Sequence, residues 1–176
     1  FPRDLPVVLP AKLEKYLKDL GFTDVRSLLW GERTRIGSHL ITALPANHFP
    51  GRSLCETQSM PQSYVVQGTK TVYFAGDSGL TRDFREIGAN FSIDLALLPI
   101  GNSRPSLFRR FHMSPEDALE AMAMLGARRM IPIHWGAFRL SLEGLEEPPR
   151  RFLHLLKERR INPKAILLQP GEKVRI

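Results

Sequence analysis

The chain has 176 residues and carries 25 lysines and arginines against 18 aspartates and glutamates, which gives a formal net charge of +7. This length suits one domain with its own hydrophobic core, and no apolar run approaches the roughly 20 residues that span a bilayer. The single cysteine, Cys55, excludes an intramolecular disulfide and a thiolate zinc cluster, and it favours a reducing, cytoplasmic compartment. The positive charge would attract phosphate-bearing or anionic-lipid partners. We expect no nucleic acid partner, because the sequence has no recognition-helix or aromatic stacking motif.

The first half of the chain is predicted to consist mainly of strands. The expected elements are a helix over residues 9–20 and strands over residues 25–29, 36–44, 63–66 and 71–75. The helix is amphipathic, with apolar residues at helical spacing, lysines opposite them and Gly21 as its stop. Pro45 ends the second strand, and Gly68 separates the last two strands, which indicates a β-hairpin.

Strands and helices alternate in the second half of the chain. The expected elements are a helix over residues 81–87, a strand over 93–100, a helix over 115–125, a strand over 130–133, a helix over 149–159 and a last strand over 165–168. The helix start at Ser114 is the strongest of these signals, because a serine N-cap is followed by Pro115 and two acidic residues. The alternation predicts an α/β layered domain.

Three side chains that can bind a metal each follow an apolar run and lie beside a Gly- or Pro-containing turn: His48, Asp77 and His134. Imidazole and carboxylate are ligands for zinc and manganese. Each residue has a plainer interpretation: His48 as a loop histidine bonded to backbone, His134 as a buried neutral imidazole and Asp77 as a turn residue. Together they predict a metal site, because α/β folds keep their sites at strand ends. Three ligands cannot fill two metal positions, and the chain contains no H-x-H or H-x-x-x-H run.

His112 is a fourth candidate for this site. It stands just before the Ser114 cap, so its ring would lie near the positive end of the helix, where a phosphate or a developing oxyanion is favoured. The alternative is a surface residue of the capping region. His39, within a predicted strand, and His154, within a predicted helix, are assigned to structure.

Five motifs in order carry a resemblance to a known family. They are Pro45-Ala46-x-His48, Phe74-Ala75-Gly76-Asp77-Ser78-Gly79, Leu97-Leu98-Pro99-Ile100-Gly101, His112-Met113-Ser114-Pro115-Glu116-Asp117-Ala118 and Ile133-His134-Trp135-Gly136-x-Phe138. The sequence resembles the metallo-β-lactamase superfamily and, within it, the branch of N-acyl-phosphatidylethanolamine-hydrolysing phospholipase D and its bacterial relatives. The resemblance implies an αβ/βα sandwich with two metals at one edge. It makes residues 1–176 the C-terminal portion of a single domain, because the family's H-x-H-x-D-H motif would precede Phe1.

The resemblance also implies a role for each candidate residue. His48 would be a ligand of the first metal, His134 a ligand of the second, and Asp77 would bridge both and share in catalysis. His112 looks like the family's additional active-site histidine, placed to bind the scissile phosphate or to assist the leaving group. The implied cofactor is a pair of zinc ions, with manganese or iron as alternatives.

The predicted function is therefore metal-dependent hydrolysis of a phosphodiester, in the manner of a phospholipase D, on a small-molecule or lipid substrate. Arg52 and Arg109 are predicted to bind the substrate anion. The mixed apolar and cationic run at residues 108–111 would suit a membrane surface, and a plain surface loop is the alternative. We expect this chain alone to be inactive and to need an upstream segment with the missing ligands. Other interpretations are a non-catalytic fragment or pseudo-enzyme that acts as a binding module, and a lactone or carbonyl hydrolase on the same scaffold. The sequence leaves the substrate, the metal and the oligomeric state open.

Overall fold

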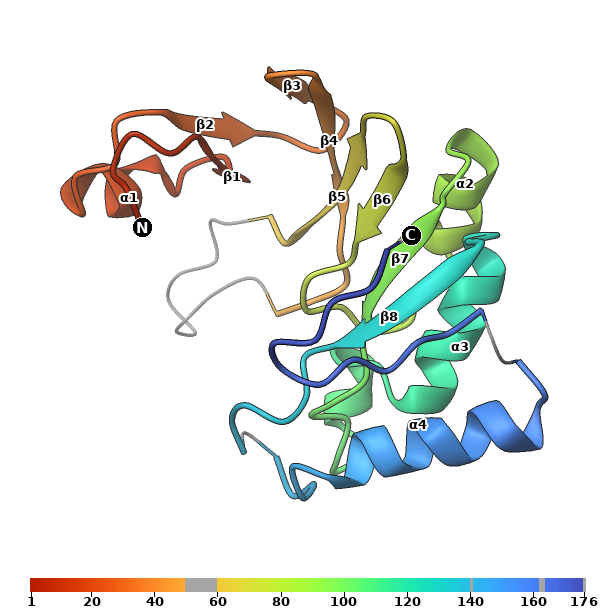
Figure 1. Cartoon of the computed structure of the whole chain (residues 1–176). Coiled ribbons are helices and arrows are strands. Elements are labelled where there is room, and N and C mark those ends of the chain that lie inside the picture. The colour runs from red at the N-terminus through yellow and green to blue at the C-terminus, as the bar shows by residue number, and fades with distance from the viewer. Residues whose placement is uncertain (50–59, 140, 162–163, 176) are drawn as a thin grey trace.

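The computed structural model describes residues 1–49, 60–139, 141–161 and 164–175, and a six-stranded sheet forms its centre (Figure 1). The strands, in spatial order, are β3 (Arg33–Ile36), β4 (His39–Pro45), β5 (Gln62–Gln67), β6 (Thr71–Phe74), β7 (Leu95–Pro99) and β8 (Arg129–Ile133). Neighbours from β3 to β6 are antiparallel, whereas β6, β7 and β8 are parallel. Because β4 and β6 are both antiparallel to β5, the strands β4, β6, β7 and β8 all run in the same direction and end at the same edge.

Helices cover one face of this sheet. The parallel strands are joined through α2 (Asp83–Asn90) and α3 (Pro115–Met124), and α4 (Glu147–Glu158) follows β8 and packs against α3. Val65, Tyr73, Ala96 and Met130 lie side by side on four neighbouring strands and are fully buried in the core that these helices share. The core therefore lies between the helices and one face of the sheet.

The second face of the sheet is only partly covered. Tyr64, Phe74, Leu97 and Ile131 are neighbours in register on β5 to β8, one residue away from the buried row and therefore on the opposite face. All four are apolar or aromatic, yet none is buried, and 38% of Phe74 is exposed. The sheet thus presents a row of partly exposed apolar side chains on the face that the helices leave open.

The N-terminal segment forms a small separate sheet, and here the sequence prediction was wrong. A helix was expected over residues 9–20, but β1 (Val7–Pro10) pairs in parallel with β2 (Val25–Leu28), and α1 (Glu14–Asp19) has six residues, none of them buried. Lys12 has a positive φ of 75°, a backbone conformation that no helix contains, so the helix cannot begin before it. Figure 1 shows this unit, with α1, away from α2, α3 and α4.

Two further strand predictions need correction. The strand expected over residues 36–44 is confirmed only from His39, where β4 begins, because the chain turns at Gly37, whose φ is 55°. Ile36 instead ends β3, a strand that was not predicted. The last strand, expected over residues 165–168, is reduced to a single bridge between Met130 and Ala165.

The other predicted elements are confirmed, including the hairpin of β5 and β6 and the capping box at Ser114, whose side chain accepts from the Asp117 amide. Among the described residues no helix has the length and apolar character needed to cross a bilayer.

Candidate metal centre

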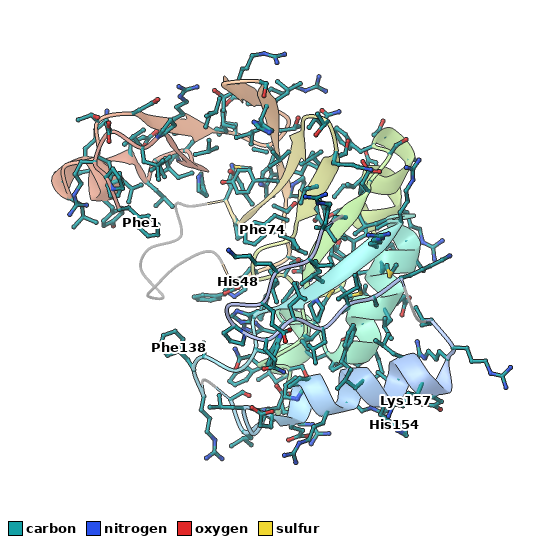
Figure 2. The ribbon with its side chains drawn as sticks, viewed as in Figure 1. Phe1, His48, Phe74, Phe138, His154 and Lys157 are labelled. Atoms are coloured by element: carbon teal, nitrogen blue, oxygen red, sulfur yellow. The ribbon has the colours of Figure 1, made fainter. Side chains whose placement is uncertain are left out.

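The shared edge of β4, β6, β7 and β8 gathers the candidate side chains. His48 follows β4, Asp77 follows β6 and His134 follows β8 directly. His112 reaches the same place from the turn before α3. Figure 2 shows His48 at this edge, near the loop that carries Phe138 beyond β8. Strand direction explains this meeting, since residues 48, 77 and 134 each follow one of the strands that end together.

His134 is held between two partners. Its Nδ1 lies 3.1 Å from Oδ1 of Asp77, and its Nε2 lies 3.0 Å from Nδ2 of Asn102. An amide nitrogen can only donate, so Nε2 accepts and Nδ1 carries the proton that it gives to Asp77. The backbone φ values of Asn102 and His134 are 63° and 59°, in the left-handed region that residues other than glycine rarely adopt. Such backbone strain is typical of functional sites.

Gly101 is required by the close approach of the His134 backbone. A Cβ atom at position 101 would lie 2.4 Å from the His134 carbonyl oxygen, which is too close for any side chain. The end of β7 therefore fixes the backbone that follows β8.

His48 is oriented by its own neighbour. Its Nδ1 lies 3.0 Å from the carbonyl oxygen of Phe49, which can only accept, so Nδ1 is protonated and Nε2 keeps a free lone pair. A histidine that donates one ring N–H to a carbonyl and offers the other nitrogen is the usual arrangement of a metal-binding imidazole.

His112 lies between the other two imidazoles. Its ring stacks on His134 at 5.5 Å with planes 2° apart, and it meets the edge of His48 at 5.1 Å. Burial, as the largest cause, together with the neighbouring His48 and His134, lowers the pKa of His112 to about 4, against the opposing effect of Asp77. The ring is therefore neutral at physiological pH. Its buried Nδ1 has no hydrogen-bond partner among the described residues, a costly state that is typical of functional groups.

Arg109, predicted to bind substrate, is engaged elsewhere in this structure. Its Nε and Nη2 donate to the two carboxylate oxygens of Asp117 at 2.7 and 2.6 Å. Burial alone would raise the pKa of Asp117, but the bonds from Arg109 and Ser114 hold it below its usual value. The pair ties the turn before His112 to the start of α3. A substrate contact for Arg109 stays a prediction.

The remaining candidates lie away from this edge or outside the described residues. Arg52 falls within residues 50–59, which the structure does not describe. His39 begins β4 at its far end, beside Gly68, and His154 lies exposed on α4, as Figure 2 shows. Neither joins the three imidazoles at the site, in agreement with the structural role assigned to both.

A small cavity opens beside His134, and two of its residues were not predicted. It has a volume of about 170 Å³, and Trp135, Phe138, Leu145 and Pro148 contribute apolar walls. Asn102 and Glu143 contribute polar groups. Glu143 is buried and accepts from the amide and the hydroxyl of Ser103 at 3.1 and 2.7 Å. Asn102 could have been found, because it follows β7 as Asp77 follows β6; Glu143 carries no such signal.

The donor types at this edge fit a divalent metal. Two ligands of a tetrahedral ion at about 2.1 Å lie about 3.4 Å apart, and the Asp77 and His134 atoms are separated by 3.1 Å. An ion could take the place of the proton between them if that proton moved to Nε2 and the Asn102 amide turned to accept it through Oδ1. The number of donors is short, however, because within the described part of the chain no group of three or more His, Cys, Asp or Glu side chains is arranged to hold a metal. The residues fit part of a metal centre.

Comparison with known proteins identifies a family and several relatives of this chain. The family model described as "Beta-lactamase superfamily domain" matches residues 2–135. An uncharacterized protein of Mycobacterium tuberculosis is 31% identical over 96% of this chain and 46% of its own length. The mitochondrial N-acyl-phosphatidylethanolamine-hydrolyzing phospholipase D of Saccharomyces cerevisiae is 33% identical over 89% of this chain and 36% of its own length. The chain thus spans less than half the length of these two relatives.

Solved structures share the fold. A metallo hydrolase from Ignicoccus hospitalis superposes on 96% of this chain and 67% of its own with a TM-score of 0.73 and 24% sequence identity. At this identity the likeness establishes the fold alone.

Proposed function

The chain belongs to the metallo-β-lactamase superfamily, and on this premise we propose that it supplies one part of the metal centre of a hydrolase. The observation that carries the proposal is the meeting of His48, Asp77, His112 and His134 at one edge of the sheet. These residues lie up to 86 positions apart in the sequence. They meet because β4, β6 and β8 end at the same edge of the sheet and the turn before α3 brings His112 to that edge.

In the proposed centre, His48, Asp77 and His134 would hold two divalent ions, which we take to be zinc, with manganese or iron as alternatives. Such ions, when bound, activate water and polarise the bond to be broken. His48 offers Nε2, because Phe49 engages its Nδ1. His134 would offer Nδ1 on the side of Asp77 with its proton moved to Nε2, where Asn102, its amide turned to present Oδ1, would accept that proton and hold the plane of the ring.

His112 is proposed as a catalytic residue that meets the substrate. A neutral imidazole can donate one proton and accept another, and the pKa of about 4 keeps His112 neutral at working pH. Its position between His48 and His134 would bring it against the group that leaves. The Arg109–Asp117 pair holds the turn from which His112 projects.

For the substrate we propose a phosphodiester of the phospholipase D type. Support comes from the net charge of +7 and from the likeness to the yeast phospholipase D. The apolar walls of the cavity beside His134 suit an alkyl or acyl group. A lactone or another carbonyl compound is the competing substrate class on the same scaffold.

We propose that the protein acts at a membrane surface from the cytoplasmic side. Leu107, Phe138 and Leu142 are each at least 73% exposed, and Phe108 is 41% exposed. These side chains lie in the loops that follow β7 and β8, next to several arginines. Apolar tips interleaved with cations are typical of a peripheral lipid-binding surface.

The missing ligands would come from a segment upstream of this chain, as part of a single domain. The partly exposed row of Tyr64, Phe74, Leu97 and Ile131 suits this proposal, because an unpaired apolar sheet face is stabilised by a second layer. The alternative is a non-catalytic binding module, which the incomplete set of metal donors within the described residues favours.

Metal retention and hydrolysis, measured on the chain alone and on the complete gene product, separate these proposals. We expect zinc to bind the chain alone more than about a hundredfold more weakly, because each ion lacks ligands. We also expect only the complete protein to hydrolyse bis(p-nitrophenyl) phosphate. Two metals retained by the chain alone after dialysis against a mild chelator would refute the incomplete centre. A complete protein that binds no metal would favour the binding module. Hydrolysis of a lactone, without hydrolysis of the phosphodiester, would show that the substrate is a carbonyl compound.

A further inference from the structure

A second hollow, larger than the first, lies beside the N-terminal part of α4. Its volume is about 770 Å³, within the range of small-molecule sites. It shares Gly144 and Leu145 with the cavity next to His134, so the two are neighbours. Neither His48, Asp77 nor His112 lines it.

Arginines from three separate segments converge on this hollow. Arg104 comes from the loop after β7, Arg139 from the loop after β8, and Arg150 and Arg151 from α4. His154, one turn further along α4, completes this side, and Figure 2 shows it on the exposed side of the helix. Scattered arginine pairs on a helix are usually solvated, but convergence from three segments requires another explanation.

The carboxylates of the hollow do not balance these cations. Arg104 pairs with Glu147 at 2.7 Å, and Arg151 pairs with Glu116 of α3 at 2.6 Å. Arg139, Arg150 and the second carboxylate of the lining, Glu146, form no ion pair within the described residues, and all three are exposed. Two guanidinium groups thus face one unpaired carboxylate across the lining of the hollow, which leaves an excess of positive charge that a bound anion would offset.

We propose that this hollow binds a phosphate-bearing ligand, with Arg139 and Arg150 as the phosphate contacts. A guanidinium presents two parallel N–H groups that match two phosphate oxygens, and two such groups can hold one phosphate from both sides. The volume of the hollow exceeds that of a phosphate, which leaves room for the organic part of a phosphomonoester, either free or as a lipid headgroup, and this is the ligand that we propose. This site is distinct from the proposed hydrolytic centre, and its occupation does not depend on that centre being active.

Calorimetric titration of the metal-free chain with glycerol 3-phosphate, in low salt and EDTA, tests the proposal. Arg139→Gln and Arg150→Gln are each expected to weaken binding at least about tenfold, because a charge-assisted hydrogen bond is lost. Arg33→Gln, at an exposed position of β3, removes the same charge far from the hollow and should leave the affinity unchanged. Unphosphorylated glycerol should not bind.

Vesicles of phosphatidylcholine with and without phosphatidic acid distinguish the two sources of phosphate. Binding to the phosphatidic acid vesicles without binding to glycerol 3-phosphate, and with the same dependence on Arg139 and Arg150, would assign the site to a lipid headgroup. An equal loss of affinity in Arg139→Gln, Arg150→Gln and Arg33→Gln would show that binding depends on net charge alone and would overturn the proposal. Loss of binding in His112→Ala, with Arg139→Gln and Arg150→Gln unaffected, would show that the phosphate binds at the hydrolytic centre. That result would also overturn the proposal. A thermal melt of each variant confirms that it is folded.

Discussion

In the proposed centre, some residues would face a metal and others would face a substrate. Asp77 and His134 are close enough to share an ion, whereas His112 stacks on His134 without offering a nitrogen to Asp77 in the described contacts. This division gives opposite expectations for the two kinds of variant.

In the complete protein, Asp77→Asn should lose at least one metal, because a neutral amide no longer balances two cations at close range. His112→Ala should keep its metals and lower turnover by about 100-fold or more, the usual contribution of a proton-transferring group. Metal analysis and hydrolysis on both variants check this. Metal loss in His112→Ala together with full loading of Asp77→Asn would reverse the roles.

The pKa of His112 makes a prediction for stability. The folded chain holds the imidazole neutral down to a pH of about 4, whereas the unfolded chain takes up a proton near 6.5. Between these values the unfolded state binds more protons, so the free energy of unfolding falls as the pH is lowered from 6.5 towards 4. Urea unfolding of the metal-free chain at pH 7 and pH 5 measures this loss, and His112→Gln should reduce it. An unchanged pH dependence in the variant would show that His112 is not the group responsible.

At the residue scale, the sequence was sufficient to find the imidazoles and the carboxylate. Each of His48, Asp77 and His134 follows a strand whose apolar pattern is visible in the sequence. Glu143 was missed because its importance comes from a neighbour in space, Ser103, which no local pattern reveals. Asn102 was missed although it follows β7 as Asp77 follows β6, because an amide is not itself a typical metal ligand.

Secondary-structure elements position the site through backbone contacts, and one of these joins the ends of β7 and β8. Gly101→Ala would place a Cβ 2.4 Å from the His134 carbonyl oxygen, so one strand end must move. We expect a loss of about 1–3 kcal/mol in the free energy of unfolding and weaker metal binding in the complete protein.

Gly144→Ala is the matched control for this substitution. It introduces the same methyl group into the same cavity wall with no atom within 4 Å. Chemical denaturation and metal titration of both variants measure the difference. Equal effects of the two substitutions would show that the contact between Gly101 and His134 does not hold the site.

Elements that pack on the core were predicted well, and those that do not were predicted poorly. The strands β5 to β8 and the helix α3 have apolar patterns that burial enforces. Residues 9–20 have a helical pattern, but no residue of α1 is buried, so pairing between β1 and β2 decides the local structure. The turn at Gly37 was missed because the apolar residues on both sides of it look like one continuous strand.

The molecule as a whole has one covered and one open sheet face, with the candidate centre at the edge between them. The helices bury the row that contains Tyr73, while the row that contains Phe74 stays partly exposed. Both the open face and the shortage of metal donors within the described residues are consistent with the smaller length of this chain relative to its matched relatives. The upstream segment that we propose would cover the face and complete the centre together.

The central claim, that His48, Asp77 and His134 are metal ligands, is tested most directly by anomalous diffraction at the zinc edge from crystals soaked in zinc. We predict a peak at about 2.0–2.2 Å from Oδ1 or Oδ2 of Asp77 and from a ring nitrogen of His48 or His134. Zinc bound only at other residues, with the Asp77–His134 contact intact beside it, would contradict the account.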